Sequence, residues 1–153
     1  DPGSAEIRKW LGTPTDRANR LKPRIPAIGR IEVTNFAADY VGTGWMLEPD
    51  VLITNRHVVE EFGMRKGGGF AFRSNADGVR YQARVDFRRE HDRGDMAQVG
   101  IDDIVFLEEP GGVRPDMALL RLSRAGGALP EPIELDDAPL RETGGDRSPL
   151  AVI

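Results

Sequence analysis

Short apolar segments separated by turn residues run through most of this sequence and limit the folds that it can adopt. The segments lie at 28–33, 41–47, 51–54, 70–72, 81–87, 104–107 and 117–122. Residues 28–33 and 81–87 alternate apolar and polar side chains, which is the pattern of a half-buried strand. Because helices do not alternate with these segments, a parallel α/β sheet is not expected. The sequence predicts an all-β barrel or sandwich.

Changes in composition divide the chain into three predicted parts. Residues 1–25 are predicted to form a short N-terminal helical extension, in which Gly12 ends a first helical stretch. Residues 26–123 are predicted to form one β-barrel. Residues 124–153 begin as a connector rich in Gly and Pro and end in the start of another strand, so the chain is expected to be cut inside that strand.

The overall composition excludes several kinds of site. The 153 residues contain no cysteine, which rules out disulfides, thiolate zinc sites and a cysteine nucleophile. The net charge of −4 gives no indication of a nucleic-acid surface, and no segment resembles a signal peptide or a membrane span. No cofactor is expected. The absence of cysteine weakly favours the cytoplasm, and the localisation is otherwise open.

His57 and Asp116 are the candidates for acid–base chemistry. His57 directly follows the apolar segment 51–54, and a base at the end of a strand is held rigidly yet remains open to solvent. Asp116 stands at the head of another apolar segment. Both residues also have a structural interpretation, because a lone histidine in a β protein is often structural and Asp116 could be a turn residue after Pro115.

The other histidine, His91, has a weaker context. It lies in a hydrophilic segment that reads as an exposed loop. Asp92 and Asp95 are close to it, but two acids in a loop fall short of a metal-coordination set. No metal site is therefore expected.

Two segments resemble trypsin-like serine peptidases, in particular the bacterial branch without disulfides that includes HtrA-like and glutamyl-endopeptidase-like proteins. The first is Gly-Thr-Gly-Trp at 42–45 together with Leu-Ile-Thr-Asn-Arg-His-Val-Val at 52–59. The second is Asp-Met-Ala-Leu-Leu at 116–120, which is similar to the segment that supplies the family's acid. The order of His before Asp also fits this family.

The resemblance implies that the chain is the N-terminal half of a two-barrel fold, and that its barrel is a six-stranded antiparallel Greek key. His57 would be the general base, and Asp116 would orient it from near the floor of a cleft. Ser148 is rejected as the nucleophile, because Arg147 stands where the family's motif has its serine. The serine is expected beyond Ile153, on a second barrel.

The resemblance thus predicts the N-terminal part of a trypsin-like serine endopeptidase that is inactive by itself. Its expected partners are a protein or peptide substrate, the missing C-terminal barrel, and a second copy that would associate through the exposed inter-barrel face. Two alternatives stay open. The chain could be a catalytically inactive protease-like module that binds or regulates, or a peptidase module fused to another activity such as a nuclease.

Overall fold

The structure is a computed structural model that describes Thr15, Asn19 and residues 22–38, 40–88, 97–111, 114–125 and 127–135. The chain divides into two compact units, and the larger one comprises Arg24–Ile133. The other unit comprises 1–23 and 134–153, of which few residues are described. Most of the predicted helical extension and the predicted strand start at the end of the chain therefore lie outside the described residues.

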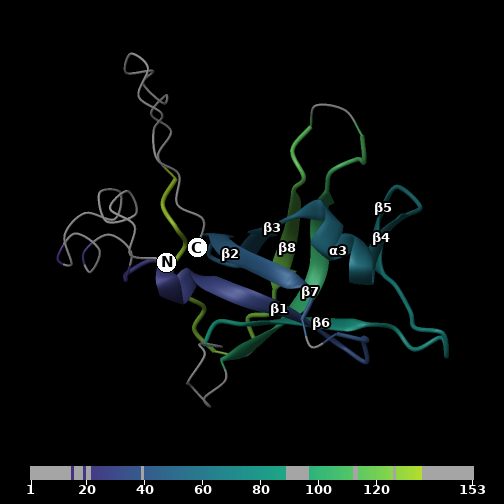
Figure 1. Cartoon of the computed structure of the whole chain (residues 1–153), viewed down its shortest axis with the longest axis horizontal. Coiled ribbons are helices and arrows are strands. Elements are labelled where there is room, and N and C mark those ends of the chain that lie inside the picture. The colour runs from purple at the N-terminus through teal and green to yellow at the C-terminus, as the bar shows by residue number, and fades with distance from the viewer. Residues whose placement is uncertain are drawn as a thin grey trace, which may run out of the picture. The chain divides into compact units, whose positions relative to one another are not determined.

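Six strands of the larger unit form a closed antiparallel barrel. They are β1 (Ile28–Thr34), β2 (Gly42–Glu48), β3 (Val51–Thr54), β6 (Gln82–Asp86), β7 (Gln98–Leu107) and β8 (Ala118–Leu122). The strand order around the barrel is β1-β2-β3-β8-β7-β6, and a short 3-10 turn, η1 (Ile25–Ala27), precedes β1 (Figure 1). The predicted all-β class with a six-stranded antiparallel barrel is confirmed.

Alternating burial along the strands places the apolar side chains inside the barrel. In β3 and β8 every second residue is buried, and Leu52 and Leu120 face each other in the ladder with no exposed surface. Met46, Ile31 and Val85 are equally enclosed. Burial of apolar surface is the main stabilising term of folding. The side chains that alternate into the barrel therefore stabilise its closed form.

β7 is longer than the sequence pattern indicates. The apolar run predicts a strand over 104–107, whereas β7 begins at Gln98. Two irregularities in its pairing with β8, between Ile101 and Asp103 and between Ile104 and Phe106, interrupt the alternation of buried and exposed residues. Such bulges add a residue without a partner and bend the strand, so the period-two signal fails there.

A helix and a hairpin lie between β3 and β6. The helix α3 (Arg56–Phe62) directly follows β3 and leads into β4 (Gly63–Lys66) and β5 (Gly69–Phe72), which form a separate two-stranded sheet (Figure 1). The turn uses positive φ angles at Gly67 and Gly68, as a tight hairpin requires. The rings of Phe62 and Phe72 stack at 5.9 Å, which ties the hairpin to the helix. The sequence pattern predicts a strand here only over 70–72.

No helix in the described part of the chain has the length and apolar character needed to cross a membrane.

Candidate active site

The register of β3 against β8 brings His57 and Asp116 together. Thr54 and Ala118 are partners in this antiparallel ladder. Residues that follow Thr54 and residues that precede Ala118 therefore leave the barrel at the same end. His57 comes three positions after the first partner and Asp116 two positions before the second, although they are far apart in the sequence.

The chain turns from β3 into α3 at Asn55, which is the N-cap residue in an extended conformation. Its side chain does not cap the helix. Instead, Nδ2 donates a hydrogen bond of 3.1 Å to the backbone oxygen of Asp116. This amide thus ties the segment before β8 to the start of the helix. The sequence assigned no role to Asn55, which appeared only within the segment 52–59.

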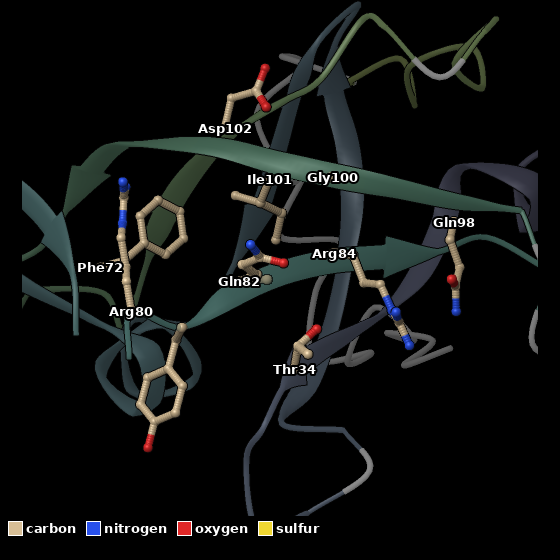
Figure 2. Close-up of a pocket in the computed structure, with 11 residues that line it drawn as sticks. Thr34, Phe72, Arg80, Gln82, Arg84, Gln98, Gly100, Ile101 and Asp102 are labelled. Carbon is tan, nitrogen blue, oxygen red and sulfur yellow. The ribbon is translucent and has the colours of Figure 1, made fainter. Parts of the chain in front are cut away.

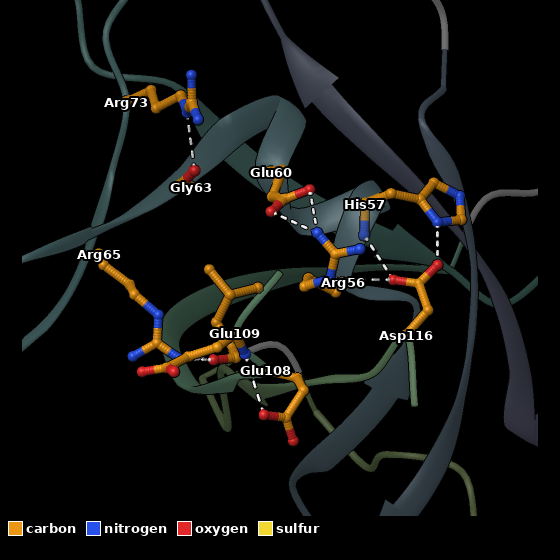
Figure 3. Close-up of polar contacts among 10 residues, drawn as sticks. Arg56, His57, Glu60, Gly63, Arg65, Arg73, Glu108, Glu109 and Asp116 are labelled. Atoms are coloured by element: carbon orange, nitrogen blue, oxygen red, sulfur yellow. Dashed lines mark hydrogen bonds and ion pairs between the residues drawn. The ribbon is translucent and has the colours of Figure 1, made fainter. Parts of the chain in front are cut away.

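His57 binds both carboxylate oxygens of Asp116. The backbone N–H of His57 donates to Oδ1 over 3.1 Å, and Nδ1 of its ring is hydrogen-bonded to Oδ2 (Figure 3). The two contacts come from the same residue, so the orientation of the carboxylate and that of the imidazole depend on each other. The second ring nitrogen, Nε2, lies on the side of the ring away from Asp116.

The charge state of Asp116 follows from these contacts. The hydrogen bond from the His57 side chain is the largest cause that lowers the pKa of Asp116. Burial opposes it as the next largest cause, and the His57 backbone N–H and the charges of His57 and Arg56 lower the pKa further. Asp116 is therefore ionised at neutral pH and can only accept hydrogen bonds. In a neutral imidazole the proton then sits on Nδ1, and Nε2 carries the free lone pair.

Arg56 is a further charged neighbour of the pair. Its Nε lies 3.6 Å from Oδ1 of Asp116, and its Nη1 donates to the two carboxylate oxygens of Glu60 at 2.8 and 2.9 Å (Figure 3). Arg56 and Glu60 are four residues apart on α3, so one helix face holds the guanidinium beside Asp116. The sequence interpretation assigned no role to Glu60, although this spacing on a helix could have indicated the pair.

The two glycines of Gly42-Thr43-Gly44 explain how α3 and β3 approach β2 closely. A Cβ atom at Gly42 would come within 2.5 Å of the Val58 side chain on α3. A Cβ atom at Gly44 would come within 2.5 Å of Leu52 and within 2.8 Å of the Ile53 backbone oxygen. Because real Cβ atoms do not approach other atoms so closely, glycine at these positions allows the helix that carries His57 to pack against the barrel.

The pair is open to solvent. The side chains of His57 and Asp116 are 64% and 37% exposed. Asp116 is thus a surface residue of this barrel, whereas the resemblance led us to expect it near the floor of a cleft.

The described serines do not lie at the pair. Ser74 forms an isolated β-bridge with Arg80, and the backbone N–H of Ser123 donates to the Gly100 oxygen at the end of β8. Ser4 and Ser148 lie outside the described residues, as does the segment with His91, Asp92 and Asp95. Within the described ranges, no three His, Asp or Glu side chains gather closely enough to hold a metal ion.

A comparison of the sequence with models of protein families gave no match, and a search of curated proteins found no relative. The functional assignment therefore depends on the geometry of His57 and Asp116.

Proposed function

We propose that this chain supplies the general base, His57, and its orienting acid, Asp116, to a trypsin-like serine endopeptidase. The observation that carries the proposal is the hydrogen bond between Nδ1 of His57 and the Asp116 carboxylate, with Nε2 left facing away from it (Figure 3). An imidazole held in this way has one nitrogen occupied by a carboxylate and the other ready to accept a proton. This is the arrangement that a Ser-His-Asp triad requires of its base.

The chemistry assigned to the pair is proton transfer. Nε2 of His57 takes the proton of a serine hydroxyl as the oxygen attacks the carbonyl carbon of a peptide bond, and the imidazolium later gives this proton to the leaving amine. Asp116 stays ionised and stabilises the imidazolium through Nδ1–H. The serine attacks and is released unchanged after hydrolysis of the acyl-enzyme by water.

The proposal places the serine and the oxyanion hole outside the 153 residues. Of the four serines in the sequence, none is followed by glycine in a Gly-x-Ser-Gly context. The strand order β1-β2-β3-β8-β7-β6, with the base directly after the third strand and the acid just before β8, is compatible with the Greek-key first barrel of the two-barrel fold. Substrate would then lie between this barrel and a second one.

Labelling with a fluorophosphonate probe tests the proposal. The chain of 153 residues should remain unlabelled, and a longer polypeptide that continues into a Gly-x-Ser-Gly segment should be labelled at a single serine. His57→Ala in the longer polypeptide should reduce the rate of labelling by about a thousandfold or more. His91→Ala is the matched control and should label at the wild-type rate.

Two results would contradict the proposal. Labelling of His57→Ala at the wild-type rate would show that another group is the base. A longer polypeptide that folds, keeps the contact between His57 and Asp116, and never reacts with the probe would favour the protease-like binding module instead.

A further inference from the structure

The carboxylate of Asp116 has one contact that does not come from His57. Its Oδ1 accepts the backbone N–H of His57 over 3.1 Å, and its Oδ2 meets Nδ1 of the ring. The remaining contact is with Arg56, whose Nε lies 3.6 Å from Oδ1 (Figure 3). Among the described residues, Arg56 is therefore the group that can hold this carboxylate independently of the histidine that the carboxylate orients.

Glu60 holds the Arg56 side chain in this place. Nη1 of Arg56 donates to the two carboxylate oxygens of Glu60 at 2.8 and 2.9 Å, and the Arg56 side chain is only 22% exposed. A guanidinium is planar and rigid, so the position of Nη1 restricts the direction in which Nε points. The guanidinium is thus tied to α3 by Nη1 and faces Asp116 with Nε (Figure 3).

The stability of α3 does not account for an arginine at this position. Arg56 is the first residue of the helix, where the helix dipole favours an acid rather than a cation. The pair with Glu60 also places the cation before the acid in the chain, which is the less favourable order for two residues four apart on a helix. The contact that favours arginine here is the one with Asp116, on the segment before β8.

Other arginine–carboxylate pairs of the barrel join neighbouring strands. Arg84 of β6 lines a surface hollow of about 520 Å³ (Figure 2) and pairs at 3.0 Å with Glu32, its partner in the ladder with β1. Arg121 of β8 pairs at 3.1 Å with Asp50, which directly precedes β3. Arg56 differs from both, because it joins the start of a helix to the carboxylate that His57 binds.

We propose that Arg56, anchored by Glu60, is a positioning residue that holds the Asp116 carboxylate in the orientation that meets Nδ1 of His57. Arg56 acts through Asp116 rather than on the substrate. Its shape matters as well as its charge, because Nη1 and Nε reach two different carboxylates. The catalytic consequence rests on the proposed function, whereas the positioning itself can be measured in the chain of 153 residues.

Hydrogen exchange of the His57 backbone amide in the 153-residue chain tests the positioning. This N–H donates to Oδ1 of Asp116, so its exchange is slowed while the carboxylate stays in place. Arg56→Gln should speed this exchange about two- to fivefold. The backbone N–H of Val59 donates to the Asn55 oxygen within α3 and should exchange at the wild-type rate, because the helix itself is kept.

Three further variants separate the parts of the bridge. Arg56→Lys keeps the charge but offers one nitrogen in place of two, so the His57 amide should exchange nearly as fast as in Arg56→Gln. Glu60→Gln removes the anchor and should have a smaller effect in the same direction, with no further effect when it is added to Arg56→Gln. Arg121→Gln breaks an arginine–aspartate pair at the other end of β3 and is the matched control, with wild-type exchange at His57.

Labelling of the longer polypeptide by the fluorophosphonate probe measures the catalytic consequence. Arg56→Gln should lower the maximal rate of labelling about two- to fivefold and leave the probe concentration that gives half of this rate unchanged. If the longer polypeptide is never labelled, the proposed function fails, and the exchange measurements still decide whether Arg56 positions Asp116.

Four outcomes would overturn the proposal. Wild-type exchange of the His57 amide in Arg56→Gln would show that Arg56 does not hold the carboxylate. Equal acceleration at His57 and Val59 would show that Arg56 stabilises α3 instead. Wild-type exchange in Arg56→Lys would show that a positive charge is sufficient without the bridge to Glu60. An unchanged maximal rate of labelling in Arg56→Gln would remove the consequence for catalysis.

Discussion

Thr54 of β3 and Ala118 of β8 lie opposite each other in an antiparallel ladder, and this pairing is the reason that His57 and Asp116 meet. Thr54 is also held by β2, on the opposite side of β3. Its buried hydroxyl donates a hydrogen bond of 2.8 Å to the Thr43 backbone oxygen. A slip by one residue would turn the apolar side chains of β3 outward, so the core itself protects the register. The candidate site is thus held by the same contacts that close the barrel.

Gly42→Ala should destabilise the barrel and disturb the candidate site. The added Cβ would lie 2.5 Å from the Val58 side chain, so α3 must shift, and we expect a loss of about 1–3 kcal/mol in the free energy of unfolding. Urea denaturation measures this loss. If the clash is with Val58, the double variant Gly42→Ala, Val58→Ala should lose less than the sum of the two single losses. Strict additivity would contradict this explanation.

Asp116→Asn should change the tautomer of His57. The wild-type carboxylate can only accept, which holds the proton on Nδ1, whereas an amide can donate its N–H to Nδ1 and leave the proton on Nε2. Long-range proton–nitrogen correlation spectra of the imidazole distinguish the two forms. Glu60→Gln keeps the carboxylate at Asp116 and should leave the tautomer as in the wild type. An Nδ1–H tautomer that persists in Asp116→Asn would show that the carboxylate does not select it.

The pKa of Asp116 should respond more to His57 than to Arg56. The hydrogen bond from the His57 side chain is the largest cause of the lowered pKa of Asp116, and the Arg56 charge is a smaller one. His57→Ala should therefore raise the pKa of Asp116 toward its ordinary value, and Arg56→Gln should raise it less. Carbon-13 titration of the Asp116 carboxyl group measures both shifts. A larger shift in Arg56→Gln would reverse our ranking of the two neighbours.

Glu32 should make the stability of the barrel depend on pH in the acid range. Burial raises the pKa of Glu32, but hydrogen bonds from Arg30 and Arg84 outweigh it and hold the pKa below its ordinary value of 4.5. A carboxylate with a lowered pKa in the folded state stabilises the fold above its unfolded pKa, and this stabilisation is lost as the pH falls through the folded pKa. The free energy of unfolding should thus decrease below pH 4.5.

The variant Glu32→Gln isolates this contribution. At neutral pH we expect it to cost about 1–3 kcal/mol, because the two guanidinium groups lose their buried acceptor. The difference from the wild type should shrink as the solution is acidified below pH 4.5. Glu61→Gln, at an exposed position of α3, is the matched control for the loss of one carboxylate away from Arg30 and Arg84. Urea denaturation at several pH values provides the measurement.

Asp86 should contribute to stability through one of its two carboxylate oxygens. It is 1% exposed, and its Oδ1 accepts hydrogen bonds from the backbone N–H groups of Arg88 and Ala97 at 3.0 and 3.2 Å. Its Oδ2 is buried with no hydrogen-bond partner. Asp86→Ala leaves two N–H groups without an acceptor, so we expect a loss of about 1–3 kcal/mol per group that stays buried.

Asp86→Asn tests which oxygen matters. Asparagine keeps one carbonyl oxygen for the two N–H groups, so its unfolding midpoint in urea should lie between those of the wild type and Asp86→Ala, or above the wild type. A midpoint as low as that of Asp86→Ala would show that the acceptor at Oδ1 is not the stabilising feature.

Local patterns predicted the strands that alternate or form a short apolar run between turn residues, and did less well elsewhere. The segment of β1 alternates apolar and polar residues, and those of β3 and β8 are short apolar runs, so all three were recognised as strands. The first part of β7 was not predicted as a strand. Gly100 and the adjacent acids Asp102 and Asp103 lie at a bulge, where the alternation of apolar and polar residues is interrupted. β4 was not predicted either, because its residues after Gly63 are exposed and it pairs only with β5.

The role of Asn55 could not be inferred from its neighbours in the chain. The Asn55 side chain donates to the backbone oxygen of Asp116, which precedes β8. This contact depends on the register of β3 against β8. Glu60 pairs with Arg56 because both lie on one face of α3, a spacing that becomes visible once the helix is known.

Strand signals and residue type are local properties of the chain, so they were enough to predict the all-β class and to select His57 and Asp116 as candidates. The six-stranded antiparallel barrel was predicted from the resemblance to a family, and the observed strand order agrees with it. Only the folded chain shows that Nδ1 of His57 meets the carboxylate of Asp116 and that Arg56 lies beside them. These relationships depend on strand register and close packing, which are set by contacts between residues that are distant in the sequence.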